Sequence, residues 1–432
     1  MGIYDKDPLI NFSSFHSNNS LFSFGLSVIV YPDNKEKVYA PIVFISKKIK
    51  NYQLKVGRWE NSLTSESILS TGSLIRSNNS IPIPQISLST PNYKKYKILK
   101  HDIWIKGGFS HGWFSKGDYV KAPFLHEKYF YIKKKFKNNS ALSVGLFDEA
   151  IWGGETKNYG SQPQSLSDYF RVITLQSASK SGLPQEQINA LGNHLGVWDI
   201  VYTKSYNTQN LKFYFQHPFE DKSSAFQHFF DELKALKFPS KSFDGLYGLE
   251  LSQKKPGLVS SLLYEYINTM NQSGPQAASD STYGWDNYYN NYIYQSGWTY
   301  NGRVIGNPLF TLGSNPGHYN DGIYIVNNRL KAHHIGLLGD LSSKIKYKLL
   351  ATFSKNYGIY YDQDRFKKLN KPYKYDGGIK QISALLELNF TNVWKNLDIR
   401  ISYAGDRGKH LGNSDGYLVS FNYNFSNLSR SH

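Results

Sequence analysis

Apolar and polar residues alternate with a period of two along many stretches of this chain, from near its start to near its end. In 416–425 (GYLVSFNYNF), every odd position from Tyr417 to Phe425 is apolar or aromatic, and the even positions hold Ser and Asn apart from Leu418. Successive side chains of a strand point to opposite faces, so this pattern predicts a strand with one apolar and one wet face. The same alternation recurs at 21–31, 52–58, 211–216, 345–354, 382–390 and 397–403. It predicts an all-β fold.

The wet faces of these strands carry charged residues in mid-strand, such as Lys348, Glu387 and Arg400. Charged groups face hydrocarbon only at a high cost, so they must face water. A transmembrane barrel with lipid outside and a polar lumen inside suits both faces and removes the sheet edges. We therefore predict an antiparallel up-and-down β-barrel of about 16–18 strands that crosses the bacterial outer membrane. A soluble β-propeller is the alternative from composition, and the lack of a strict internal repeat weighs against it.

The composition of the 432 residues agrees with such a barrel. No run approaches the roughly 20 consecutive apolar residues that a membrane-spanning helix needs, whereas a barrel strand needs them only at alternate positions. The chain is 16% aromatic, with 34 Tyr and 26 Phe, and aromatic rings gather at both membrane interfaces. The absence of Cys excludes a disulfide framework and a thiolate metal site.

The chain is basic, with 50 Lys and Arg against 33 Asp and Glu and a formal net charge of +17. A basic excess attracts polyanions, which include nucleic acid, lipid headgroups and acidic polysaccharide. The charges are scattered over strands and turns, and only 133–137 (KKKFK) is a dense basic run. The only support for nucleic-acid binding is the net charge, which is not enough, so we do not expect nucleic acid as a partner.

We expect residues 1–425 to form a single barrel domain, followed by a tail at 426–432. The start of the chain, MGIYDKDPLINF, lacks the pattern of a signal peptide, which predicts a mature or trimmed sequence. Residues 62–96 are rich in Ser, Asn and Pro, and we expect an irregular plug or loop insertion there because its prolines exclude a central strand.

Two other stretches do not have the pattern of a barrel strand. Residues 222–238 have Phe and Leu at helical spacing, which predicts an amphipathic helix on a barrel end. Residues 165–176 begin with Ser165 and Asp168 in the spacing of a capping box, and a short helix and a strand are both open there. We therefore expect one or two short helices beside the barrel.

Several longer motifs of the chain resemble the Wzi family of capsule-assembly proteins, in the divergent form of Bacteroidetes-type Gram-negative bacteria. These motifs are LSTGSLIRSNNSIPIPQISLSTP (69–91), FDEAIWGG (147–154), NHLGVWD (193–199), QHPFED (216–221), DGLYGLE (244–250), WDNYY (285–289) and GWTYNGRVIGNPLF (297–310). The resemblance covers about residues 20–425. It implies an outer-membrane barrel of about eighteen strands with a lectin-like role, which is to hold capsular polysaccharide at the cell surface.

Three groups of residues suit a polysaccharide site, because sugars offer apolar ring faces for stacking and many hydroxyls for amides, and uronic acids offer carboxylates for Arg. We predict polysaccharide contacts for Trp152, Glu155, Arg76, Asn78, Asn79, Trp285, Asp286, Asn287 and Tyr288. Each group has a structural alternative. Trp152 suits an interface girdle, Arg76 and its neighbours suit a role in pinning the insertion to the wall, and the 285–292 stretch suits an ordinary loop.

No zinc-protease pattern, nucleophile elbow or Ser–His arrangement is present, so we expect no metal, no cofactor and no enzymatic activity. The expected function is an outer-membrane, lectin-like barrel that attaches or organises acidic capsular or surface polysaccharide. Its expected partners are that polysaccharide, outer-membrane lipid and other envelope proteins. The alternatives are a structural subunit of a larger outer-membrane complex and a diffusion porin.

Overall fold

The computed structural model describes most of the chain. The described residues are 10–16, 22–30, 38–60, 67–115, 120–180, 182–188, 190–220, 223–228, 243–272, 286–313, 325–360 and 373–423.

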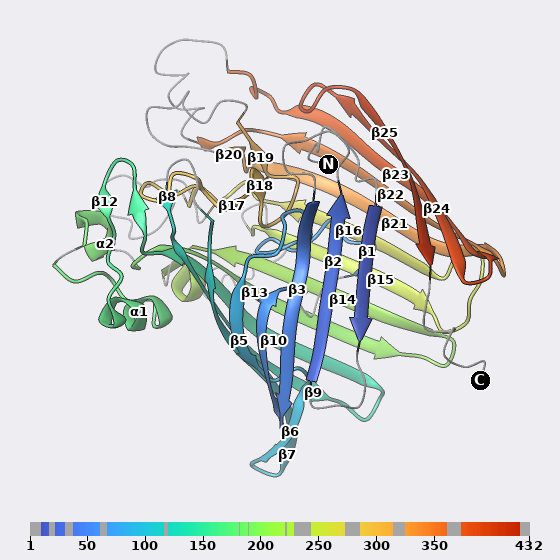
Figure 1. Cartoon of the computed structure of the whole chain (residues 1–432), viewed down its shortest axis with the longest axis horizontal. Helices are drawn as coiled ribbons and strands as arrows, with labels where there is room; N and C mark the ends of the chain where they lie inside the picture. Colours follow the sequence, from blue (N-terminus) through green and yellow to red (C-terminus); the bar gives the residue numbers. More distant parts are fainter. Residues whose placement is uncertain are drawn as a thin grey trace.

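Eighteen strands form one antiparallel sheet (Figure 1). They are β1 (Ile10–His16), β2 (Phe22–Val30), β3 (Val38–Ile49), β4 (Tyr52–Arg58), β5 (Gln85–Ser89), β6 (Lys94–Ile98), β7 (His101–Trp113), β9 (Phe124–Lys135), β10 (Ser140–Trp152), β13 (Asn193–Ser205), β14 (Gln209–Phe219), β15 (Gly245–Gln253), β16 (Ser261–Asn268), β21 (Leu330–Ser342), β22 (Ile345–Asn356), β23 (Ile379–Trp394), β24 (Leu397–Gly408) and β25 (Ser414–Tyr423).

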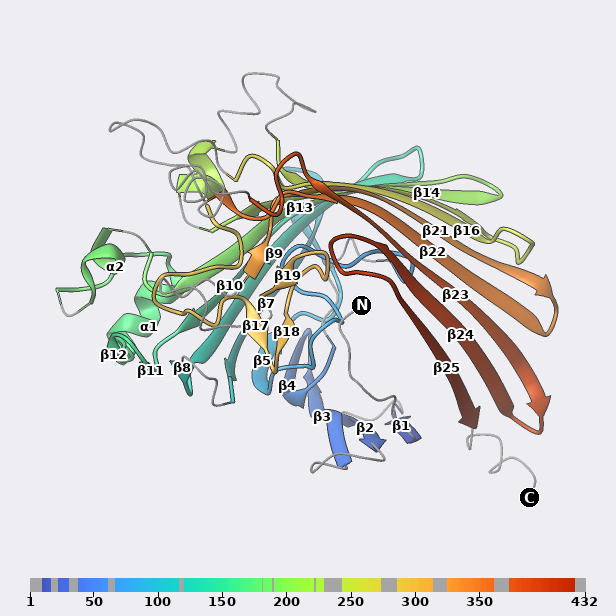
Figure 2. The ribbon, with the colours of Figure 1, turned by 90° about the horizontal axis from the view of Figure 1, so that it is seen from above.

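Neighbouring strands of the sheet follow one another along the chain, as in an up-and-down barrel. The pairings run from β1–β2 to β24–β25, and the described residues contain no pairing between β1 and β25. Strands β5 and β6 together occupy one position, since β5 pairs with Gly108–Gly112 of β7 and β6 pairs with His101–Ile105. Seen from above, the sheet curves around residues 286–313 (Figure 2).

The two faces of the strands have the predicted character. In β22, Leu349 and Phe353 are 37% and 46% exposed, whereas Thr352 and Ser354 are buried. Other exposed apolar residues on the strands are Ile45, Leu88, Phe130, Ile335, Leu386, Ile401 and Val419. Exposed apolar residues on the outer face of the strands reverse the order of a water-soluble protein and are typical of a barrel in lipid. The all-β barrel prediction is confirmed.

The two ends of the sheet differ in their connections. One end has short turns, such as Lys50–Asn51 between β3 and β4 and Lys395–Asn396 between β23 and β24. The other end carries the long connections, including residues 59–84, 153–192 and 269–324. In outer-membrane barrels the short turns are periplasmic and the long loops are extracellular, so the long connections form the outer mouth.

Short elements lie in these long connections. They are β8 (Val120–Lys121), β11 (Glu155–Thr156), β12 (Gly160–Ser161), α1 (Leu166–Ile173), α2 (Pro184–Ile188), the π-helical turn η1 (Ser223–His228), β17 (Thr299–Tyr300), β18 (Arg303–Val304), β19 (Thr311–Leu312) and β20 (Ile325–Asn327). No helix within the described ranges has the length and apolar character needed to cross a membrane.

Of the two alternatives for residues 165–176, the helix is right. The hydroxyl of Ser165 accepts a hydrogen bond from the backbone N–H of Asp168 at 3.2 Å, and the Asp168 carboxylate accepts one from the backbone N–H of Ser165 at 2.9 Å. This capping box satisfies backbone donors that a strand start would not leave free, and so fixes the beginning of α1.

Two expected boundaries differ in the structure. The irregular segment expected at 62–96 ends at Pro84, because β5 and β6 lie in the wall. Its prolines precede β5 or fall between the two strands, where no ladder hydrogen bond is needed. Of the amphipathic helix expected at 222–238, only η1 is described, and the rest lies outside the described residues. The Ala225 carbonyl of η1 accepts a hydrogen bond from Trp198 Nε1 at 2.7 Å.

The main hydrophobic core lies on the inner face of the sheet, where two segments fill the lumen. We name residues 67–84 the plug loop and residues 286–313 the aromatic loop. Core residues of the plug loop are Leu69, Leu74, Ile75 and Ile83, and those of the aromatic loop are Tyr288, Tyr289, Ile293, Tyr294, Trp298, Tyr300, Val304, Ile305 and Phe310. They pack against inward residues of the wall, such as Leu125, Val197 and Leu263.

Candidate functional site

Polar residues of the wall hold the plug loop from several sides. The buried carboxylate of Glu265 on β16 accepts hydrogen bonds from Ser70 Oγ at 2.5 Å and from the Thr71 backbone N–H at 2.8 Å. The side-chain oxygen of Gln216 on β14 accepts one from the Leu74 N–H at 3.0 Å. Because each wall residue satisfies backbone or hydroxyl groups in a buried place, the plug loop has a defined seat in the lumen.

An ion-pair cluster fixes the far part of the plug loop. Arg76 lies 2.6 Å from Glu149 of β10 and 3.4 Å from Glu127 of β9, and all three side chains are less than a tenth exposed. A guanidinium between two buried carboxylates neutralises charge that would otherwise be stranded in the interior. The observed contacts of Arg76 therefore agree with the structural alternative, in which this residue attaches the insertion to the barrel wall.

The plug loop and the aromatic loop hold each other. Trp298 Nε1 donates to the carbonyl of Ile75 at 2.8 Å, and the hydroxyl of Tyr289 donates to the carbonyl of Leu74. The side chain of Asn307 donates to the carbonyl of Gly72 at 2.6 Å. These bonds satisfy backbone groups of an irregular segment, which has no ladder to satisfy them.

Asn78 and Asn79 have different surroundings. Asn78 is exposed, and it lines a pocket with Arg76 at the outer mouth. The remaining residues that line this mouth pocket are Trp59, Glu60, Ser77, Ser80, Ile81, Pro82, Ile83 and Ile305. Asn79 donates from its side-chain amide to the carbonyl of Val304 at 2.9 Å, so its contacts join the two lumen segments.

Sequence reasoning did not identify Trp59 and Glu60 as residues of this pocket. Trp59 follows the last residue of β4, and the ammonium of Lys55 lies 4.6 Å from its ring centroid. The sequence signal that could have identified Trp59 is a Trp at the end of a predicted strand, directly before a Pro-rich insertion. An indole, a carboxylate, an amide and hydroxyls converge there, which is a set of groups that suits sugar hydroxyls and ring faces.

Trp152 and Glu155 lie in another part of the outer mouth. Trp152 ends β10 and is 3% exposed, with its ring stacked on Tyr169 of α1 at a centroid distance of 4.9 Å. Glu155 of β11 is exposed and lies 3.4 Å from the ammonium of Lys121. Gly153 and Gly154 between them have φ values of 64° and 75°, which favour glycine and turn the chain sharply.

The third predicted group is only partly described, because Trp285 lies outside the described residues. Asp286 and Asn287 are half-buried. The side-chain oxygen of Asn287 accepts a hydrogen bond from the amide of Asn328 at 2.6 Å. Tyr288 is 1% exposed, and its hydroxyl donates to Asp244 at 3.3 Å. The contacts of Asn287 and Tyr288 therefore hold the aromatic loop in place.

The structure does not bring the three groups into one pocket. The mouth pocket contains Arg76 and Asn78 of the predicted residues, and neither Trp152 nor Asp286 lines it. A link between the regions exists through the loops, since Asn158 donates to the side-chain oxygen of Gln295 at 2.8 Å. Within the described ranges, no group of three or more His, Asp or Glu could hold a metal ion.

The loop between β24 and β25 closes on the lumen segments through His410. Its Nε2 lies 3.3 Å from the hydroxyl of Thr311, and its backbone N–H donates to Gln381 at 3.2 Å. Burial, with a smaller contribution from the charge of Lys374, lowers the pKa of His410 to about 4. The imidazole is therefore neutral in the folded protein at neutral pH.

Acid is expected to loosen this contact. Because the folded pKa of His410 is below the ordinary 6.5, its stabilisation is complete above pH 6.5 and is lost as the pH falls towards 4, on the order of 2 kcal/mol. Hydrogen exchange of residues 409–413, followed from pH 7 to pH 4.5, measures the loss. In His410→Gln the added acid sensitivity should vanish, and parallel pH curves for the two proteins would contradict the assignment.

Comparisons with known proteins agree with the architecture. The model of the family described as capsule assembly protein Wzi matches residues 14–314, which is more than half of the chain. A comparison with curated proteins gives no match.

Solved structures of outer-membrane proteins resemble the protein, and two of them illustrate the likeness. Wzi of Escherichia coli, described as an outer-membrane protein involved in group 1 capsule assembly and as a carbohydrate-binding β-barrel, matches with a TM-score of 0.57 and 15% identity, over 95% of this chain and 76% of that chain. OprD of Pseudomonas aeruginosa matches with a TM-score of 0.46 and 11% identity, over 96% of this chain and 85% of that chain. The first of these likenesses shows the fold. The family match shows that the chain belongs to the Wzi family of capsule assembly proteins and is a β-barrel of the bacterial outer membrane.

Proposed function

We propose that this protein holds acidic capsular polysaccharide at the outer face of the outer membrane and does not cleave or modify it. The observation that carries the proposal is the combination of family membership with a lumen filled by the plug loop and the aromatic loop. A barrel filled in this way offers a polar surface at its mouth. The carbohydrate-binding description of the E. coli protein supports the same role.

The mouth pocket is the proposed contact site for the polymer. Asn78 is exposed there and offers an amide, and Ser80 offers a hydroxyl beside it. Arg76 also lines the pocket, but its guanidinium contacts Glu127 and Glu149, which offset its positive charge. Its role in this proposal is to position the plug loop. Trp152 and Tyr288 are buried, so the stacking predicted for them would require their rings to become exposed.

The basic excess of the chain favours an acidic polymer. Its net charge of +17 attracts a polyanion, and salt weakens such long-range attraction. Repeating units of one polymer contact several copies of the protein, so weak individual contacts add up. The proposal therefore predicts salt-sensitive, multivalent binding.

Removing the amide of Asn78 is expected to weaken polysaccharide binding by roughly threefold to tenfold, because one neutral hydrogen bond contributes about 0.5–1.5 kcal/mol. Retention of the detergent-solubilised protein on immobilised, purified capsular polysaccharide, measured over a salt series, tests this for Asn78→Ala.

The matched control is Asn207→Ala, which removes an exposed Asn from the short turn between β13 and β14 at the opposite end of the barrel. Its retention should equal that of the wild type. Equal retention of all three proteins would show that the mouth pocket is not the contact site, and no retention of the wild type at low salt would contradict the proposed function itself.

A further inference from the structure

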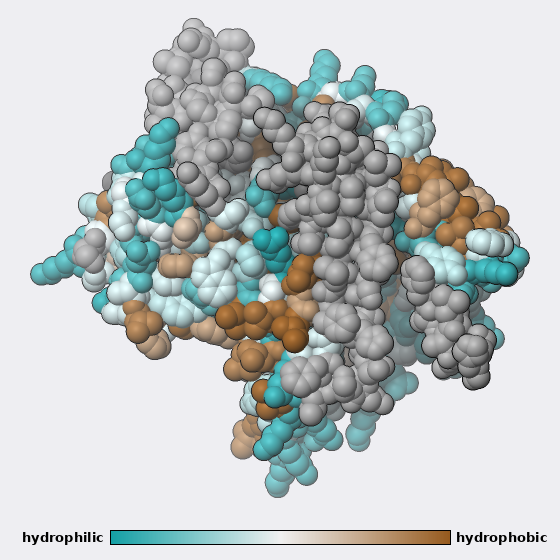
Figure 3. Space-filling view, viewed as in Figure 1, coloured by the Kyte–Doolittle hydropathy of each residue, from teal (hydrophilic) through white to brown (hydrophobic). Residues whose placement is uncertain are grey.

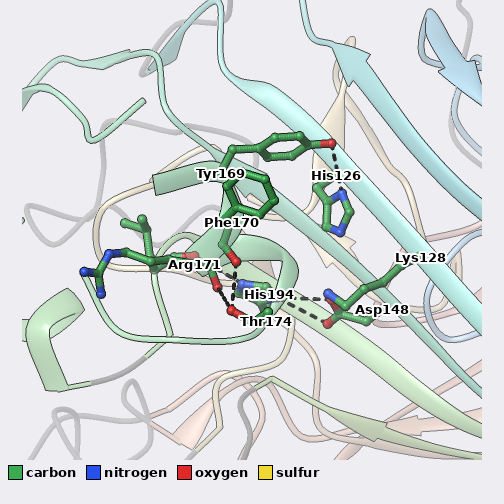
Figure 4. A network of polar contacts seen from close by, with 9 residues as sticks. His126, Lys128, Asp148, Tyr169, Phe170, Arg171, Thr174 and His194 are labelled. Atoms are coloured by element: carbon green, nitrogen blue, oxygen red, sulfur yellow. Dashed lines mark hydrogen bonds and ion pairs between the residues drawn. The ribbon is translucent and has the colours of Figure 1, made fainter. Parts of the chain in front are cut away.

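The excursion between β10 and β13 lies against the outward face of the wall. On β9, Leu125 and Glu127 belong to the inner face, so His126, Lys128 and the 51%-exposed Phe130 face outwards. By the same alternation Asp148 of β10 also faces outwards. His126 and Asp148 are nevertheless buried at the extracellular end and Lys128 is partly buried, because α1 and its neighbouring residues pack beside them (Figure 4).

A polar cluster is enclosed beneath this cover. Asp148 contacts Lys128 and lies 3.2 Å from Nδ1 of His194. Nε2 of His194 lies 3.1 Å from the carbonyl of Leu191, and the hydroxyl of Tyr169 lies 3.5 Å from Nδ1 of His126. A bare wall would present these groups to lipid, which accepts charged groups only at a high cost. The excursion shields them.

Helix α1 attaches to the wall through one face only. Tyr169 stacks on Trp152, and its ring also meets the edge of Phe109 at a centroid distance of 6.2 Å. Val172 is fully buried in a cluster with Ala150, Trp152, Ala178 and Leu191. This face holds the helix on the wall. Within the part of the chain that the structure describes, the opposite edge of the helix is left exposed.

The outer edge of α1 is strongly apolar. Leu166 is 80% exposed and Phe170 is 66% exposed, and their four-residue spacing places them side by side on the helix. On the wall beside them, Phe109 and Trp113 of β7 are also exposed, at 38% and 40%. Figure 3 shows apolar residues, drawn in brown, along the lower margin of the part that contains α1 and on the adjoining strands. The edge of α1 is thus continuous with the lipid-facing surface of the barrel.

We propose that α1 is an interfacial membrane helix, whose Leu166–Phe170 edge enters the acyl-chain margin of the outer leaflet while the helix shields the Lys128–Asp148–His194 cluster from lipid. Short amphipathic helices lie in the membrane interface in this way, with their apolar face towards the acyl chains. Ser167 is exposed and lies further around the helix, on the side that this arrangement places in water.

Spin labelling tests the proposal directly, because the chain has no Cys and each introduced Cys is unique. Leu166→Cys and Phe170→Cys, each carrying a nitroxide, are reconstituted in vesicles of phosphatidylethanolamine and phosphatidylglycerol. Power saturation then compares collisions with oxygen, which concentrates in lipid, and with a nickel chelate, which stays in water. Phe130→Cys is the lipid reference, and Asn207→Cys is the water reference.

The proposal predicts that labels at 166 and 170 collide with oxygen and are protected from the nickel chelate at least severalfold compared with Asn207→Cys. Ser167→Cys, on the same helix, should resemble the water reference. Nickel accessibility at 166 and 170 equal to that at 207 would overturn the proposal, and so would labels shielded from both reagents, because that result indicates a protein partner. A heat-dependent shift in electrophoretic mobility establishes that each variant is folded.

Discussion

Replacing Arg76 by alanine is expected to destabilise the plug loop by about 3–5 kcal/mol, the usual cost of removing one partner from a buried ion pair. Glu127 and Glu149 are almost fully buried, and Arg76 is the cation that both contact. Without it, two neighbouring carboxylates stay in the interior, so they repel each other and bind protons or water. The plug loop should then leave its seat during part of the time.

Two measurements detect this change in Arg76→Ala. The temperature at which the protein loses its heat-dependent mobility shift should fall, and the conductance of the protein in planar bilayers should rise from little current to frequent open events. A filled lumen is what separates this barrel from a diffusion porin, so the wild type should stay nearly silent in the same experiment.

Arg407→Ala is the matched control, since it breaks an exposed ion pair with Asp415 whose side chains are 50% and 42% exposed. An exposed pair contributes about 0–1 kcal/mol, so both measurements should stay near wild-type values. If Arg76→Ala behaved like Arg407→Ala, the seat of the plug loop would not depend on the buried cluster.

Replacing Glu265 by alanine should release the other part of the plug loop. Its carboxylate accepts hydrogen bonds from Ser70 Oγ, from the N–H and hydroxyl of Thr71, and from the Tyr214 hydroxyl. Each buried donor left without an acceptor costs about 1–3 kcal/mol, so the sum exceeds about 3 kcal/mol unless water enters. Hydrogen exchange at the Thr71 amide should accelerate by more than about a hundredfold.

Two further variants serve as comparisons for Glu265→Ala, one with an intermediate expected effect and one with none. Glu265→Gln keeps one side-chain oxygen as an acceptor, and its effect should be intermediate. Glu155→Ala removes an exposed carboxylate whose ion pair with Lys121 is largely solvated, so exchange at Thr71 should not change. Unchanged exchange in Glu265→Ala would show that the core packing of Leu69, Leu74 and Ile75 alone seats the loop.

The alternation of side chains predicted the wall well because each strand has to satisfy lipid and lumen at once. Ile401 is 45% exposed while its neighbour Ser402 is buried, as the sequence pattern alone indicates. A different pattern failed at β5 and β6, where Pro82, Pro84 and Pro91 suggested an irregular segment throughout. A proline cannot donate a ladder hydrogen bond at its own position, but it does not prevent the residues after it from forming a strand.

The mouth pocket was harder to predict than the wall. Asn78 and Asn79 are adjacent and chemically identical, yet one is exposed and the other bonds to Val304. Only the path of the plug loop through the lumen separates them, and that path depends on contacts with strands far away in the chain. For the same reason the partners of Arg76 could not be read from its neighbours in sequence.

The most direct test of the proposed role is the distribution of capsular polysaccharide between cells and medium. Polysaccharide is quantified in both fractions for a strain that lacks the gene and for the same strain complemented with the wild-type chain. We predict that loss of the protein moves polysaccharide into the medium at unchanged total amount and unchanged polymer length, and that the wild-type chain restores the cell-bound fraction. An unchanged cell-bound share, or a change in polymer length, would contradict the role of a non-enzymatic surface holder.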